Sequence, residues 1–126
     1  MKICVSASGN SIESSMDPRF GRSAYFIIAD ADTMESEIIE NSAAASGGGA
    51  GINSGQLMVD RGVEVVITGN VGPNAMNVLK AANIDIYHGE SVPVKENIDE
   101  FKKGLLKKIT STVPSHFGMG VQGGQK

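Results

Sequence analysis

The chain has 126 residues, a formal net charge of −3 and a single cysteine. This length suits one domain that buries about two-thirds of its unfolded surface, and a single cysteine excludes an internal disulfide. The acidic balance argues against nucleic-acid binding, and because no apolar run has the length of a membrane helix or signal-peptide core, we expect a cytoplasmic protein without membrane contact.

The first predicted strand is followed by a loop of unusual composition. Residues 2–8 alternate, with Ile3 and Val5 on one face and Cys4 and Ser6 on the other, which is typical of a strand. The loop that follows, residues 9–23, contains Met-Asp-Pro-Arg-Phe-Gly-Arg at positions 16–22. Because ordered loops of this length inside compact domains tend to be functional, this segment is a candidate binding loop.

Two further strands and a helix are predicted in the middle of the chain. Residues 24–30 and 35–41 read as strands, and their short polar connection predicts an antiparallel hairpin. Residues 42–51 consist of small side chains without periodicity, so we expect a mobile segment. Residues 52–61 have helical spacing and end at Gly62.

The stretch 63–88 reads as a strand, a helix and a returning strand. Val-Glu-Val-Val-Ile at residues 63–67 resembles a buried parallel strand, and a glycine turn then leads to Pro73, a residue favoured at the first helical position. Apolar residues at positions 94, 98, 101, 105 and 109 predict an amphipathic last helix, which Gly104 is able to end early. We therefore expect a domain over residues 1–109 and a flexible tail over 110–126.

These elements predict the fold class. Three strands precede an alternation of helices and strands, which indicates a three-layer α/β/α domain with a five-stranded mixed sheet and one antiparallel strand. Helices are expected on both faces, since the strands at residues 2–8 and 63–67 read as buried on both sides.

The chain carries little of the chemistry that enzymes need. It has no P-loop and no Ser/His/Asp arrangement, and the first strand offers Cys4, Ser6 and Ser8 where a two-metal nuclease needs carboxylates. Segments after Ser8, Thr68 and Tyr87 are expected to meet at the carboxyl edge of the sheet. Two predicted helix N-termini at this edge favour an anionic ligand.

Several residues are candidates for such a site, each with a structural alternative. Arg19 and Arg22 suit an anion, or intradomain salt bridges. Gly69 and Gly72 suit a binding loop or simple turn chemistry. The candidate metal ligands are Cys4, His88, His116 and Met119. The structural alternative is a buried thiol for Cys4, a surface imidazole for His88, and a place in an unstructured tail for His116 and Met119.

The motifs at residues 17–26 and 65–75 resemble those of a known family. Asp-Pro-Arg-Phe-Gly-Arg-Ser-Ala-Tyr-Phe, then a glycine-rich loop, then Val-Val-Ile-Thr-Gly-Asn-Val-Gly-Pro-Asn-Ala are similar to the dinitrogenase iron-molybdenum cofactor biosynthesis family, of the NifX and NifB C-terminal type. The resemblance spans about residues 2–106. It implies a ribonuclease H-like fold and a non-catalytic protein that binds or carries an iron-sulfur or iron-molybdenum cofactor, or its precursor, between assembly proteins.

The residue patterns, taken together with the resemblance, give the candidate site residues. The cofactor-binding candidates are Arg19, Phe20, Gly21, Arg22, Gly48, Gly49, Gly69, Gly72 and His88, and the metal candidates are His88, His116 and Cys4. The expected partners are metallocofactor assembly proteins, and we expect a monomer or weak homodimer.

Two other functions remain open. The chain also suits an interaction or regulatory module without a cofactor, which binds a protein through the Phe20 loop and the lysine-rich last helix. An enzyme that acts on a small anionic metabolite is a third, more distant reading.

Overall fold

The structure, a computed structural model, describes residues 1–42 and 50–110. Its elements, in chain order, are β1 (Lys2–Ala7), the 3-10 helix η1 (Phe20–Arg22), β2 (Tyr25–Asp30), β3 (Ser36–Glu40), α1 (Ala50–Asp60), β4 (Val65–Thr68), α2 (Pro73–Ala81), β5 (Asp85–His88), α3 (Val94–Lys102) and β6 (Lys107–Lys108).

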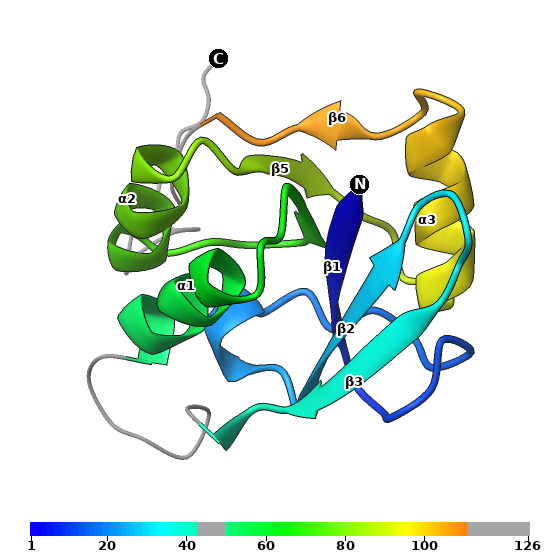
Figure 1. Cartoon of the computed structure of the whole chain (residues 1–126), viewed down its shortest axis with the longest axis horizontal. Helices are drawn as coiled ribbons and strands as arrows, with labels where there is room; N and C mark the ends of the chain where they lie inside the picture. Colours follow the sequence, from blue (N-terminus) through cyan, green and yellow to red (C-terminus); the bar gives the residue numbers. More distant parts are fainter. Residues whose placement is uncertain (43–49, 111–126) are drawn as a thin grey trace, which may run out of the picture.

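The strands form a single mixed sheet in the order β3-β2-β1-β4-β5-β6 (Figure 1). Strands β1, β4 and β5 pair in parallel, whereas β2 is antiparallel to both of its neighbours and β6 is antiparallel to β5. The expected hairpin and the central strand-helix-strand unit are confirmed. The sheet has six strands, however, so the prediction of five strands with one antiparallel was wrong.

The strand that was not predicted, β6, lies where the last helix was expected to continue. Helix α3 ends at Lys102, and Gly104 follows with a φ of 75°, in the left-handed region where glycine is favoured. The chain then reverses, and Ile109 donates its N–H to Ile86 O at 2.7 Å. Leu105 and Ile109 therefore continue the helical spacing by coincidence and belong to a turn and a strand end.

Helices cover both faces of the sheet, which confirms the three-layer arrangement (Figure 1). On one face, Met58 of α1 and Leu79 of α2 pack with Cys4 and Val66 of the sheet. On the other face, side chains of α3 pack with the opposite set of strand residues, Ile3, Val5, Ile27, Val65 and Ile67. Successive side chains of β1 thus lie alternately in two separate apolar layers, as the sequence predicts.

The predicted mobile segment 42–51 and the predicted tail lie mostly outside the described residues. Residues 43–49 and 111–126 are not described, and they include Gly48, Gly49, His116 and Met119. Among the described residues, no helix combines the length and the apolar composition needed to cross a bilayer.

Candidate functional site

The carboxyl ends of the parallel strands meet at one edge of the sheet. The register pairs Thr68 at the end of β4 with His88 at the end of β5, and β1 ends beside them at Ala7. Helix α2 begins a few residues after β4, at Pro73, with its N-terminus at this edge. The segments predicted to converge here are therefore neighbours in the fold.

Buried hydroxyl groups fix the candidate binding loop to the sheet. The Ser6 hydroxyl donates to Asp17 O at 2.6 Å, and Asp17 N–H donates to Ser6 O at 2.9 Å. Thr68 Oγ1 lies 2.6 Å from Ser6 Oγ, and since the Ser6 proton is given to Asp17, Thr68 is the donor in this second bond. Ser6 and Thr68 are fully buried, so these bonds anchor the loop from inside the core.

The same loop interlocks with the turn after β4. Asn70 N–H donates to Pro18 O at 2.6 Å, and Phe20 N–H donates to Asn70 O at 3.3 Å. A Cβ on Gly69 would lie 2.8 Å from Pro18 Cα and 2.9 Å from Pro18 O, so only glycine fits at this approach. By contrast, a Cβ on Gly72 meets nothing within 4 Å.

Phe20 is part of the core and does not form a surface. Its side chain is 1% exposed, and its ring centroid lies 5.4 Å from that of Phe26. Phe20 therefore stabilises the position of the loop, and only the neighbouring residues are available to a ligand.

The two arginines of the loop differ in their partners. Arg19 donates from Nε to Asp17 Oδ1 at 3.1 Å and from Nη2 to Asp17 Oδ2 at 2.9 Å, which is the intradomain pairing considered for it. Hydrogen bonding to Arg19 holds the pKa of the Asp17 carboxyl below its usual range. Arg19 keeps 66% of its side chain exposed, whereas Arg22 is exposed and makes no ion pair within residues 1–42 and 50–110.

Two further features of this edge suit an anion. Helix α2 has Gly72 as its N-cap, with no side-chain cap hydrogen bond, so the first turn of the helix has N–H groups without a side-chain acceptor. His88 is exposed and lies directly across from Thr68, on the face of the sheet that α1 and α2 cover.

Cys4 lies in a different environment. Its side chain is fully buried beneath α1 and α2, and burial raises the pKa of the thiol. This placement favours the structural alternative for Cys4. No group of three or more His, Cys, Asp or Glu side chains in the described part of the chain is arranged to hold a metal ion.

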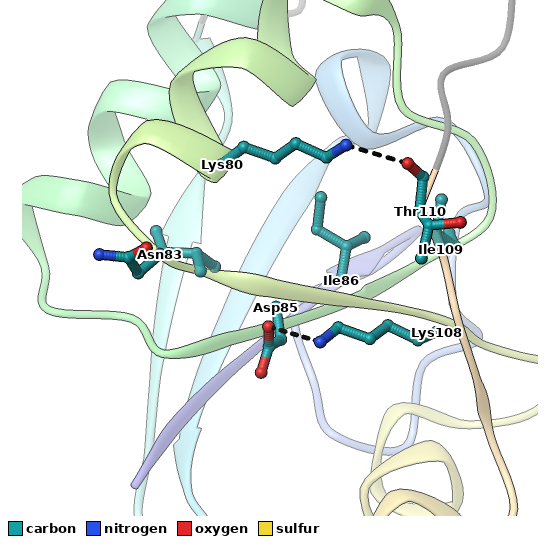
Figure 2. A pocket seen from close by; sticks show the side chains of 8 residues that line it. Lys80, Asn83, Asp85, Ile86, Lys108, Ile109 and Thr110 are labelled. Carbon is teal, nitrogen blue, oxygen red and sulfur yellow. Dashed lines mark hydrogen bonds and ion pairs between the residues drawn. The ribbon is translucent and has the colours of Figure 1, made fainter.

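The described pockets lie away from Arg19 and His88. One of about 270 Å³ lies between the end of α2 and strands β5 and β6, and its two lysines are already engaged (Figure 2). Lys80 donates to Thr110 O at 2.9 Å, and Lys108 pairs with Asp85 at 3.0 Å. A second pocket, of about 290 Å³, lies between the end of β3 and α1.

Two asparagines that position this edge were not singled out from the sequence. Asn97, fully buried in α3, accepts from Glu90 N–H at 2.8 Å and donates to Glu90 O at 3.0 Å, which fixes the loop after His88. Asn41 donates to Ser23 O at 2.8 Å and ties the end of β3 to the arginine loop. The sequence contains a signal for Asn97: it follows Val94 at helical spacing, so it is a polar residue at a position expected to face the core.

Comparison with known proteins places these features in a family. The uncharacterized protein MJ0580 of Methanocaldococcus jannaschii is 35% identical over 112 residues, which cover 86% of this chain and 92% of that protein. The apo form of the orange protein from Desulfovibrio gigas superposes with a TM-score of 0.83 at 36% identity, covering 87% of this chain and 93% of that one. A NifB-type protein from Thermotoga, TM1290, has a TM-score of 0.80 at 36% identity, with coverage of 90% and 97%.

The family match covers most of the chain. Residues 1–104 match the family described as dinitrogenase iron-molybdenum cofactor. This span includes the interlocked loops, the N-terminus of α2 and His88, and it confirms the resemblance read from the two motifs. The chain belongs to the dinitrogenase iron-molybdenum cofactor family.

Proposed function

We propose that the protein binds an iron-sulfur or iron-molybdenum-type cluster, or a precursor of one, as cargo and carries it between metallocofactor assembly proteins without catalysing a reaction. Membership of the family supports this class of cargo. One similar structure, that of the orange protein, is of an apo form.

The observation that carries the proposal is the junction of the arginine loop with the turn that leads into α2. The Asn70 contacts to Pro18 and Phe20, and the pairing of Arg19 with Asn70, hold Arg19 beside the turn that leads into α2, whose N-terminus lacks a side-chain cap. Arg22 follows in the same loop, at the end of η1. Metal-sulfur clusters of this kind are anionic, and guanidinium groups and free helix N–H groups are the donors that stabilise a desolvated anion.

The side chains available to bind the cluster suit a protein that later releases it. The described residues offer one exposed imidazole, that of His88, and no exposed thiol, because Cys4 is buried. A cargo held mainly by charge and hydrogen bonds, with at most one imidazole ligand, is released more readily than one held by several thiolates. We therefore assign Arg22 and Arg19 to anion binding and His88 to a ligand position.

Anaerobic reconstitution with ferrous iron and sulfide tests this function. The full chain is expected to retain iron and sulfide through gel filtration and to show visible charge-transfer absorption. Arg22→Ala and His88→Ala should each weaken uptake about tenfold or more, because each removes a contact to the cargo. Arg61→Ala, which removes an arginine paired with Glu37 elsewhere on the surface, is the matched control and should leave uptake unchanged.

Failure of the chain to retain a cluster under any anaerobic condition would contradict the proposal. Equal loss of uptake in Arg22→Ala and Arg61→Ala would also contradict it, since that result would mean that general surface charge, and not this edge, attracts the cargo. The alternative function, an interaction module without a cofactor, expected Phe20 to contact a protein partner. The burial of Phe20 argues against this contact.

A further inference from the structure

The two outer edges of the sheet carry opposite charges. Strand β3 forms one edge and β6 the other, at opposite ends of the strand order (Figure 1). Residues 35–40 contain three glutamates and no basic residue, whereas residues 102–108 contain four lysines and no acidic residue. We call the first segment the acidic edge and the second the basic edge.

The acidic edge has unsatisfied charge and an exposed apolar side chain. Glu37 pairs with Arg61, but Glu35 and Glu40 are exposed and form no ion pair within residues 1–42 and 50–110. Ile38 is 44% exposed and pairs in register with Ile27, which places it on the face of the sheet that α3 covers.

The basic edge has the same two features with the opposite charge. Lys108 pairs with Asp85, whereas Lys102, Lys103 and Lys107 are exposed and have no ion pair with any described residue. Leu105 lies in the turn from α3 to β6 and is 66% exposed, the largest exposed fraction among the exposed large apolar side chains of the described chain.

The directions of the strands allow these edges to pair. Strand β3 runs parallel to β1, because both are antiparallel to β2, while β6 runs against β5 and therefore against β1. When two copies lie side by side in the same orientation, the β6 of one meets the β3 of the other as an antiparallel pair. Ile38 and the turn that holds Leu105 then approach on the α3 side.

Charge selects this pairing over the alternatives. Lysines and glutamates on edge strands oppose the addition of another strand of like charge, so β3 against β3 and β6 against β6 are both disfavoured. Only the acidic edge against the basic edge brings opposite charges together. We propose that the chain self-associates edge to edge, with the acidic edge of one copy docked on the basic edge of the next.

This contact is heterologous, so each copy keeps one edge free after pairing. The pairing uses a short strand, β6, and exposed charges, so it is expected to be weak and sensitive to salt. It does not use the side chains of Arg22 or His88, although Lys107 of the basic edge is the register partner of His88 on the neighbouring strand.

Sedimentation velocity of the full chain, without cluster, tests the pairing with charge reversals. Wild-type protein at low salt should show a sedimentation coefficient that rises with protein concentration, with about tenfold weaker association at about 0.5 M salt. Glu35→Lys with Glu40→Lys, and separately Lys103→Glu with Lys107→Glu, should each abolish the rise. A mixture of the two double variants should restore it, because complementary edges are then present again.

Glu13→Lys with Glu96→Lys is the control for net charge, since it reverses two exposed acids outside both edges, and it should associate as the wild type does. A monomer at every concentration and salt level would overturn the proposal. So would association that persists in both double variants, or a mixture that stays monomeric. Circular dichroism of each variant confirms that a loss of association is not a loss of folding.

Discussion

At the scale of single residues, Gly69 decides whether the two loops of the site can interlock. Gly69→Ala places a methyl group against the Pro18 backbone, at 2.8 Å from Cα, where neither segment is free to yield. We expect this substitution to lower the free energy of unfolding by about 1–3 kcal/mol, as overpacking does elsewhere. Urea denaturation of the purified variant measures the change.

Gly72→Ala is the matched control three residues along the same turn. Its Cβ enters open space, and its φ of −72° is accessible to alanine. The weaker N-cap is offset by the lower entropy of the unfolded chain, so the net change should stay within about 0.5 kcal/mol. Equal destabilisation by the two substitutions would show that the close approach at Gly69 is not what the turn depends on.

The Asp17–Arg19 pair gives stability a specific pH dependence. The folded state lowers the pKa of Asp17, so the pair stabilises the fold above the ordinary carboxyl pKa of about 4, and this stabilisation is lost as the pH falls through the lower folded pKa. Arg19→Gln should therefore destabilise the protein at pH 7 and much less at about pH 2. Urea denaturation of both proteins across this range measures the difference.

Subtracting the two curves removes the contribution of the other carboxyl groups, which both proteins share. Arg61→Gln removes an exposed ion pair with Glu37 and should give a smaller difference from wild type at neutral pH, because solvent screens such a pair. A difference between wild type and Arg19→Gln that did not change with pH would contradict the account of Asp17.

At the scale of elements, helix α3 holds the end of β5 in place through one buried amide. Asn97 binds both the N–H and the carbonyl of Glu90, and it also donates to Val92 O at 3.3 Å. Asn97→Ala leaves the Glu90 N–H without its acceptor, whereas Glu90 O and Val92 O keep the N–H groups of Val92 and Met16 as donors. We expect the substitution to cost about 1–3 kcal/mol of unfolding free energy. Thermal denaturation, followed by circular dichroism, measures the loss.

Asn77→Ala is the control, because Asn77 is an exposed residue of α2 and its substitution should change stability by less than about 0.5 kcal/mol. Hydrogen exchange adds a local readout: the amide of Gly89, which donates to Thr68 O at 2.9 Å, should lose protection in Asn97→Ala. Unchanged protection there would mean that Asn97 does not position the segment after His88.

The elements show which patterns are sufficient for prediction. Strand β1 and the strand-helix-strand unit around Pro73 follow from local alternation and from a proline that suits a helix start. Strand β6 did not follow, because Leu105 and Ile109 keep helical spacing after the helix has ended. The backbone angle of Gly104, which ends the helix, is not visible in an apolar periodicity.

The site was predictable as a location but not in its contacts. The carboxyl ends of parallel strands converge at one edge of a sheet, and this rule alone predicts that Thr68, His88 and the arginine loop are neighbours. The sequence did not reveal that Phe20 is buried, that Arg19 is bound to Asp17, or that Asn97 fixes the edge. Each of these depends on pairings between segments distant in the chain, which local patterns do not encode.

At the scale of the whole molecule, the sheet has two distinct kinds of boundary. Its carboxyl edge gathers cationic and N–H donors, while its two lateral edges carry opposite charges. We assign the first to cargo and the second to contact between copies, so that loading and self-association occupy different surfaces. Reversing the acidic edge with Glu35→Lys and Glu40→Lys should therefore leave cluster uptake intact, whereas Arg22→Ala should leave sedimentation unchanged.

The most direct measurement of the central claim is the metal and acid-labile sulfide content of the full chain, purified without oxygen from cells. The account predicts that iron or molybdenum is present together with sulfide, in amounts that fall in Arg22→Ala and remain in Arg61→Ala. Protein that is free of both metal and sulfide, and that still takes up neither on anaerobic reconstitution, would contradict it.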